Sequence, residues 1–129
     1  MKRDMDLIRE LLLKLESLPL RRGDVWIINA DDDVIQIPGY DGHQIDYHMS
    51  LIEEAGLIDS AGAGAMDGFG FRRLSWSGHD FVDSVRSSDV WDKTKSVASA
   101  AGGWTLDLLA ASAKAYLELK FKELLGGQS

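Results

Sequence analysis

Few residues of this chain have the types and spacing that catalysis or metal binding requires. The histidines His43 and His48 lie five positions apart, whereas two ligands on one face of a helix lie about four apart. The acidic run 31–33 lacks the alternation and the distant glutamate of a calcium loop. We therefore predict no metal site and a solvated turn at 31–33. His48 is expected to pack between a helix and a hairpin with one ring nitrogen hydrogen-bonded, and His79 to support a helix start.

Other signatures of catalysis are missing from the sequence as well. The glycine-rich segment 62–70 lacks the lysine of a phosphate-binding loop, and no strand leads from it into a helix. The chain has no cysteine, which excludes a thiol nucleophile, disulfides and cysteine-ligated zinc, and which fits a reducing cytosol. No serine elbow or well-placed pair of carboxylates is visible. We predict a protein that is not an enzyme and that carries no cofactor.

The first half of the chain predicts two helices separated by short strands. Leucines and isoleucine recur at helical spacing over 4–18, with Asp4 as N-cap and Pro19 as terminator. The β-branched runs 25–28 and 34–37 flank an acidic loop and predict a hairpin, or one strand beside an irregular segment. Turn residues then lead into a helix over 42–55, which Gly56 ends.

The second half predicts a hairpin followed by three helices. Residues 57–59 and 71–74 read as strands joined by the glycine-rich loop, which makes the tip of the hairpin. A helix from Ser75 or Ser77 to Val85 is expected to turn Trp76 inward, and a helix from Ser88 to about residue 98 to bury Val97. The last helix, capped by Thr105, carries one apolar stripe: Leu106, Leu109, Ala110, Ala113, Leu117, Phe121 and Leu124.

Two segments resemble parts of known DNA-binding folds. The stretch 45–58 ends in Ala55-Gly56-Leu57-Ile58 and resembles the recognition helix and first wing strand of ArsR- and MarR-type winged helices. The returning segment 73–81 looks like the start of the helix that follows the wing. Over residues 1–90 the order is most similar to DUF2513, an uncharacterised family of bacteria and prophages. This resemblance implies a winged-helix-like core.

The resemblance and the periodicity together define the predicted architecture. The fold class is α+β, with a winged-helix-like domain at 1–86 and a helical extension at 87–129 that packs on the core or dimerises the protein. Only one clear helix lies between the first helix and the wing. The helix that usually braces the recognition helix is therefore missing or very short, and the prediction departs from a standard winged helix at that point.

Charge is distributed unevenly along the chain, whose formal net charge is −7. Residues 1–22 contain six Lys or Arg and four acids, residues 23–71 contain ten acids and no Lys or Arg, and residues 72–129 contain eight Lys or Arg and seven acids. The recognition-like helix therefore lies inside a segment without a Lys or Arg. Because DNA affinity comes mainly from Lys and Arg on phosphates, this helix is poorly suited to a duplex.

We accordingly predict a cytoplasmic, non-enzymatic binding module with no membrane span, whose acidic face suits a basic protein partner. It is expected to be prophage-associated and could inhibit a nucleic-acid-handling protein by occupying its basic groove. The alternative is a winged-helix regulator that binds double-stranded DNA. A homodimer through the last helix is a further expectation. The predicted partner-binding residues are Gln44, Asp46, Tyr47, Ser50 and Phe69, and the predicted DNA-binding residues are His43, Gln44, Tyr47, Arg72 and Arg73.

Overall fold

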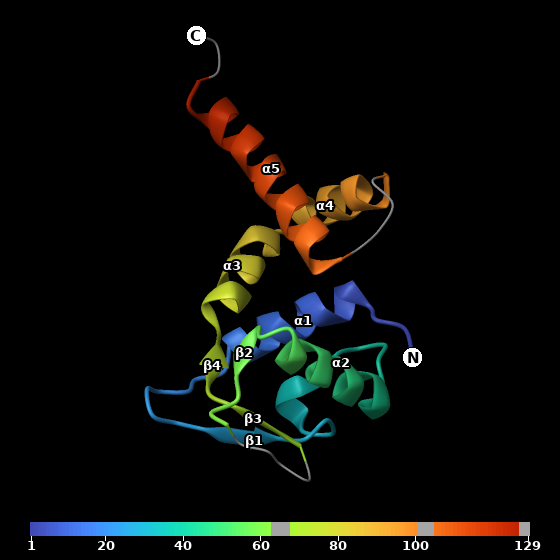
Figure 1. The fold of residues 1–129 in the computed structure, drawn as a ribbon, viewed down its shortest axis with the longest axis vertical. Coiled ribbons are helices and arrows are strands. Elements are labelled where there is room, and N and C mark those ends of the chain that lie inside the picture. Colours follow the sequence, from blue (N-terminus) through green and yellow to red (C-terminus); the bar gives the residue numbers. More distant parts are fainter. Residues whose placement is uncertain (63–67, 101–104, 127–129) are drawn as a thin grey trace. The chain divides into compact units, whose positions relative to one another are not determined.

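A computed structural model of the chain describes residues 1–62, 68–100 and 105–126. Within them, helices combine with two short antiparallel sheets, so the predicted α+β class is confirmed (Figure 1). The chain divides into two units, Met1–Asp80 and Phe81–Ser129, and their boundary falls inside a helix rather than after it at 86. In chain order the elements are α1 (Met5–Glu16), β1 (Trp26–Ile28), the 3₁₀ helix η1 (Asp33–Ile35), α2 (Gly42–Glu54), β2 (Ile58–Asp59), β3 (Phe69–Phe71), β4 (Arg73–Leu74), α3 (Trp76–Val85), α4 (Ser88–Ala100) and α5 (Leu106–Leu124).

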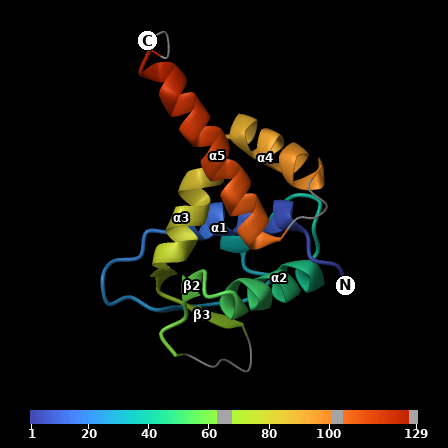
Figure 2. The same ribbon diagram turned by 45° about the horizontal axis from the view of Figure 1, so that its top comes forward.

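Helix α1 forms the centre of the first unit. Asp4 is its N-cap, as predicted, and the side chain of Asp4 accepts a hydrogen bond from the backbone N–H of Leu7 at 3.2 Å. The apolar face of α1 packs against α2, β4 and η1, and α1 lies alongside α2 in two views (Figures 1 and 2). The buried apolar side chains of α1 are Met5, Leu7, Ile8, Leu11, Leu12 and Leu15.

The strands pair in a pattern that the sequence predicts only in part. β2 pairs with β4, with Ile58 opposite Leu74, and this confirms the predicted hairpin. β1 pairs instead with β3, with Trp26 opposite Phe71. Arg72 separates β3 from β4, and its backbone N–H donates to the carbonyl of Asp59 at 2.9 Å. The returning arm of the hairpin therefore contributes one strand to each sheet, β3 to the first and β4 to the second.

Of the two alternatives predicted for this region, the hairpin is wrong and the single strand beside an irregular segment is confirmed, because residues 34–37 overlap η1 and pair with no strand. Side chains supply the hydrogen bonds that a strand ladder would have made. The amide of Gln36 donates to the carbonyls of Ala30 at 2.8 Å and Asp32 at 3.0 Å, and the carboxylate of Asp32 accepts from the N–H of Asn29 at 2.8 Å. Such local side-chain bonds compete with secondary structure.

The prediction that Trp76 turns inward is also wrong, since its side chain is 85% exposed. The reason is the close packing of Gly78 against the backbone of Leu57, just before β2, where a Cβ added to Gly78 would lie 2.0 Å from the carbonyl oxygen of Leu57. Successive helical residues are rotated by about 100°, so a residue two positions from Gly78 lies on nearly the opposite face. Trp76 therefore faces solvent, while Phe81 and Val82 are buried.

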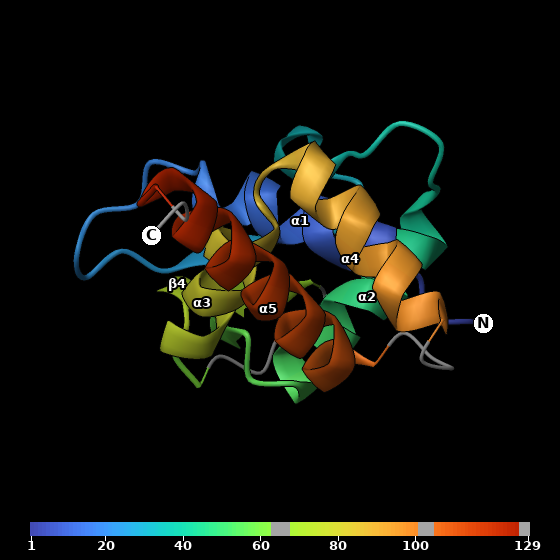
Figure 3. The same cartoon turned by 90° about the horizontal axis from the view of Figure 1, so that it is seen from above.

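The second unit contains the last residues of α3 and the helices α4 and α5, which pack side by side (Figure 3). On α4, Trp91, Thr94 and Ala98 are buried. Val97 lies at the edge of this face and is 54% exposed, contrary to prediction.

Helix α5 begins at the predicted cap, where the Thr105 hydroxyl accepts from the N–H of Leu108 at 3.1 Å. Its apolar stripe is buried only in the first half, at Leu109 and Ala113. In the second half, Phe121 is 62% and Leu124 84% exposed, so this part of the stripe is not buried within the described chain. Among the described residues, no helix has both the length and the apolarity to cross a bilayer.

Candidate functional site

The outward face of α2 carries most of the residues that the sequence singles out. Asp41 and Gln44 form a capping box that fixes the start of the helix: the carboxylate of Asp41 accepts from the backbone N–H of Gln44, and the Gln44 side chain accepts from the N–H of Asp41, both at 2.9 Å. Ile45, Met49 and Ile52 are buried on the inner side. The opposite side of α2 therefore faces solvent, and the buried side holds the helix in place along its length.

The exposed side chains of this face differ in how free they are to bind. Gln44 is half-buried, and its side-chain amide oxygen accepts the hydrogen bond of the capping box. The hydroxyl of Ser50 donates to the carbonyl of Tyr47 at 2.6 Å, so it serves the helix itself. Tyr47 is 38% exposed, and its ring stands edge-on to that of His48 at 5.6 Å between centroids. Tyr47 and Asp46 are the predicted residues that this face offers most directly.

The charge of the α2 face is negative. Asp41, Asp46, Glu53 and Glu54 are all exposed on α2 or at its cap. The segment from residue 23 to 71 supplies no Lys or Arg that could offset them. Apart from His43, which is exposed, the face has no side chain that can become positive. We call the exposed side of residues 41–54 the acidic face.

An open hollow with a mixed polar and apolar lining lies in the same cation-free segment, between β1 and η1. Its volume is about 570 Å³, and it is lined by Val25 to Ile28 and by residues 32–34. Ile27 is 51%, Val25 41% and Val34 39% exposed. Asp32 and Asp33 add negative charge to the lining. Exposed apolar side chains beside carboxylates are the surface that a partially apolar, basic partner would cover.

Phe69 is not available for the role that the sequence gave it. The side chain is only 7% exposed and belongs to β3, where Phe69 lies opposite Ile28. The expectation that Phe69 is presented to a partner is therefore wrong. The rest of the predicted tip, residues 63–67, lies outside the described residues.

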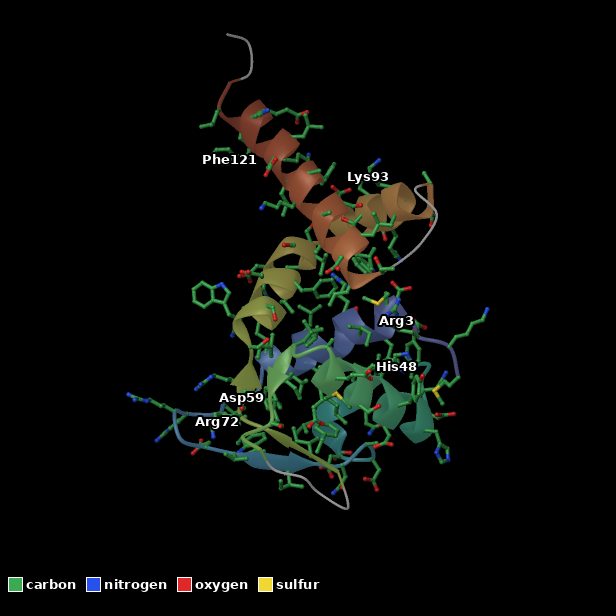
Figure 4. The ribbon with its side chains drawn as sticks, in the orientation of Figure 1. Arg3, His48, Asp59, Arg72, Lys93 and Phe121 are labelled. Atoms are coloured by element: carbon green, nitrogen blue, oxygen red, sulfur yellow. The ribbon has the colours of Figure 1, made fainter. Side chains whose placement is uncertain are left out.

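Arg72 and Arg73 lie away from α2, at the junction of β3 and β4. Both guanidinium groups approach the carboxylate of Asp59, at 3.5 Å from Arg72 and 3.6 Å from Arg73 (Figure 4). The Nε of Arg72 is buried without a hydrogen-bond partner among the described residues. Arg73 is the more exposed of the two, with a side chain 60% accessible. Much of the positive charge of this pair is thus balanced by Asp59.

A buried polar network ties α2 to the start of α1. His48, which is 1% exposed, accepts a hydrogen bond at Nε2 from the N–H of Asp4 at 2.8 Å. Its Nδ1 lies 2.7 Å from the carbonyl of Gln44, which can only accept, so Nδ1 carries the proton. Both ring nitrogens are used, and the ring packs against α1 instead of at the predicted junction with the hairpin.

Asp4 extends this network to Tyr40. The Tyr40 hydroxyl donates to the second carboxylate oxygen of Asp4 at 2.8 Å. Burial of the phenol raises the pKa of Tyr40 to about 12, and the hydrogen bond to Asp4 and the negative charges of Asp4, Asp6 and Glu10 add to the shift. Sequence analysis missed this pairing because Asp4 and Tyr40 are far apart in the chain, and the cap role of Asp4 was the only signal. The network is built for stability, since His48 is sealed from solvent.

No cluster of three or more His, Asp or Glu side chains that could hold a metal ion occurs in the described part of the chain. The described residues define a small α+β protein that presents an acidic helix face.

Comparison with known sequences places this protein in a family. The chain matches the family described as "Hypothetical protein (DUF2513)" over residues 2–104, and it belongs to that family. An "Uncharacterized protein" of Haemophilus influenzae is 32% identical over 127 residues, which cover 97% of this chain and 99% of that protein. The relative therefore also spans α5, which lies beyond the family match. No solved structure matches the chain.

Proposed function

We propose that this protein is a non-enzymatic binding module whose acidic face docks on a basic protein partner. The observation that carries the proposal is the exposure of Asp46, Glu53 and Glu54 on α2 within a segment that has no Lys or Arg. Complementary potentials speed encounter and select partners, so a helix of this charge favours a basic surface. Tyr47 adds an exposed aromatic ring, a side-chain type that is enriched where binding energy concentrates.

The first unit is proposed to be a variant winged helix. Its order of α1, β1, η1, α2, β2 and the β3–β4 arm is the order expected of that fold when η1 takes the place of the bracing helix. In this proposal α2 occupies the recognition position but carries the wrong charge for phosphate. A prophage-associated protein of this kind could act in the cytoplasm as an inhibitor, by covering the basic groove of a nucleic-acid-handling protein.

A charge reversal on α2 tests the proposal. The wild type, Asp46→Lys and Asp92→Lys are immobilised and exposed to cell lysate with and without nuclease, and captured proteins are identified by mass spectrometry. Asp92 is an exposed acid on α4, so Asp92→Lys makes the same charge change outside the acidic face. We expect a basic protein to be captured in both nuclease arms by the wild type and by Asp92→Lys. Asp46→Lys should bind it about tenfold or more weakly, a loss of about 1.4 kcal/mol.

Capture that is insensitive to Asp46→Lys would contradict the proposal, as would recovery of nucleic acid alone. If the recovered nucleic acid is a duplex, the second outcome favours the alternative, a duplex-binding regulator that uses His43, Gln44 and Tyr47 on α2 with Arg72 and Arg73. The exposure of Arg73 is the observation that favours this alternative. In that case Arg72→Glu with Arg73→Glu should abolish binding, and affinity should fall steeply with salt.

A further inference from the structure

We propose that a positively charged end of the first unit binds single-stranded nucleic acid. This end is formed by Trp76, Arg21, Arg22, Arg72 and Arg73. Trp76 is the most exposed large apolar side chain among the described residues, at 85%. Tryptophan is on average a highly buried residue, so this degree of exposure is unusual. We call these five residues the arginine–tryptophan patch.

The position of Trp76 is fixed on both sides by hydrogen bonds. Ser75 donates its backbone N–H to the carbonyl of Leu57 at 2.9 Å, and its hydroxyl donates to the carbonyl of Gly56 and accepts from the N–H of Gly78 at 3.0 Å. The hydroxyl of Ser77 also donates to Gly56, at 3.3 Å. With Gly78 pressed against Leu57, the backbone on either side of Trp76 has little freedom. The indole is therefore presented by a rigid turn rather than by a loose segment.

Two arginines come to the patch from the turn that precedes β1. The Arg21 N–H donates to the carboxylate of Asp24 at 2.9 Å, and the Asp24 N–H donates back to the carbonyl of Arg21 at 2.9 Å. Gly23 closes this turn with φ +95°, a conformation that other residues rarely adopt. Arg21 and Arg22 are both exposed, and none of the ion pairs found among the described residues involves them.

The strand register brings this turn next to the other two arginines. Trp26, at the start of β1, lies opposite Phe71, so the residues just before β1 run beside Arg72. Figures 1 and 3 show the loop between α1 and β1 on the β4 side of the unit. Arg73 is three residues from Trp76, which limits the distance between their Cα atoms to about 11 Å. The register and the short sequence separation therefore bring the four arginines and Trp76 to one end of a single unit.

An exposed aromatic plane among guanidinium groups suits a stacked base with a phosphate on each side. A duplex fits less well, because its footprint would extend onto the acidic α2 of the same unit, where Asp46 and Glu53 would repel phosphate. A single strand needs contact over only a few nucleotides and can remain on the patch. Asp59 and Asp24 partly offset the arginines, so we expect about three phosphates to be neutralised in total, with moderate affinity.

The test uses the full-length protein and fluorescein-labelled oligothymidine or oligouridine of about twelve nucleotides, within the site sizes of single-strand binders. Fluorescence anisotropy gives the affinity of the wild type, Trp76→Leu, and Arg21→Glu with Arg22→Glu. Lys93→Glu with Lys122→Glu is the control, because these exposed lysines on α4 and α5 give the same change in net charge (Figure 4 labels Lys93). Circular dichroism of each variant confirms folding, and a duplex of equal length is the third probe.

We expect the wild type to bind a single strand better than the duplex, and to weaken about 20-fold from 50 to 200 mM salt if about three phosphates are neutralised. Trp76→Leu should bind about 5- to 150-fold more weakly, because it loses one stacked base. The double substitution Arg21→Glu with Arg22→Glu should abolish binding, and the control Lys93→Glu with Lys122→Glu should change the affinity little. Absence of binding at low salt, equal binding by Trp76→Leu, or preference for the duplex would each overturn the proposal. If the wild type binds a single strand, a higher affinity for oligothymidine indicates a DNA ligand and a higher affinity for oligouridine an RNA ligand.

Discussion

Replacing Gly78 by alanine tests whether α3 is seated as rigidly on β2 as the structure shows. The added Cβ would lie 2.0 Å from the carbonyl oxygen of Leu57 and 3.0 Å from its carbonyl carbon. Both atoms belong to backbone, so no flexible side chain can move aside. The helix start must therefore shift away from β2, and the bonds that Ser75 makes to Leu57 and Gly56 must lengthen or break.

The expected cost follows from three contributions. Overpacking of this kind costs about 1–3 kcal/mol, and each disturbed hydrogen bond costs about 0.5–1.5 kcal/mol. The higher helix propensity of alanine returns about 1 kcal/mol. With two disturbed hydrogen bonds, we therefore expect Gly78→Ala to lower the free energy of unfolding by about 1–5 kcal/mol.

Gly42→Ala is the matched control, because Gly42 begins α2 and a Cβ there would meet nothing within 4 Å. That change should be neutral or stabilising by up to about 1 kcal/mol. Urea unfolding followed by far-ultraviolet circular dichroism and by tryptophan fluorescence measures both variants. A Gly78→Ala protein within about 0.5 kcal/mol of the wild type, below the cost of one disturbed hydrogen bond, would refute the reasoning.

Three further predictions concern other parts of the molecule. Tyr40 has a folded-state pKa of about 12 against 10.0 when unfolded, so its stabilising contribution should be complete below pH 10 and disappear as the pH rises through about 12. Tyrosinate absorbance should show this late ionisation of Tyr40, and Tyr40→Phe should lack it. Asp4→Asn should move the pKa of Tyr40 toward 10.0, and an unchanged pKa in that variant would exclude the role of Asp4. Thr94 is fully buried and its hydroxyl has no partner among the described residues; Thr94→Val should therefore raise the free energy of unfolding by about 1 kcal/mol, and a destabilised variant would reveal a missed hydrogen bond. The homodimer through α5 remains a prediction, and sedimentation velocity tests it: a wild-type dimer should become a monomer in Phe121→Asp, whose side chain is 62% exposed (Figure 4), and a wild-type monomer at high concentration would contradict it.

Local signals in the sequence were sufficient for the helices and their caps. Asp4 and Thr105 cap α1 and α5 as predicted, because an N-cap needs only its own side chain and the next turn of backbone. The buried side of α2 also followed from periodicity, since Ile45, Met49 and Ile52 all face inward. The acidic surface was predictable from composition alone, because it depends on a segment that lacks Lys and Arg.

What the sequence did not predict depends on contacts between distant residues. A β-branched pattern cannot say which strand it will pair with, so pairing of β1 with residues 34–37 was one of two predicted alternatives, and its pairing with β3 was not predicted. Trp76 was assigned to the core by its residue type, but the close approach of Gly78 to Leu57 decides the helix rotation. Phe69 was assigned to the surface because it lies near glycines, yet its pairing with Ile28 buries it. In each case the deciding neighbour lies far away in the chain.

The pairing of β1 with β3 also determines the order in which the first unit can fold. Trp26 and Phe71 are separated by more than half of that unit, so their pairing closes a long loop. Closing this loop costs conformational entropy before the contacts between the two strands can stabilise the fold. The helices and the β2–β4 hairpin close shorter loops and can form first. We infer that the β1–β3 pair forms after the individual helices and the β2–β4 hairpin, and that it is released before them during partial unfolding. The three residues of β1 would then be the point where the native protein begins to open, and their amide hydrogens would exchange before those of α1.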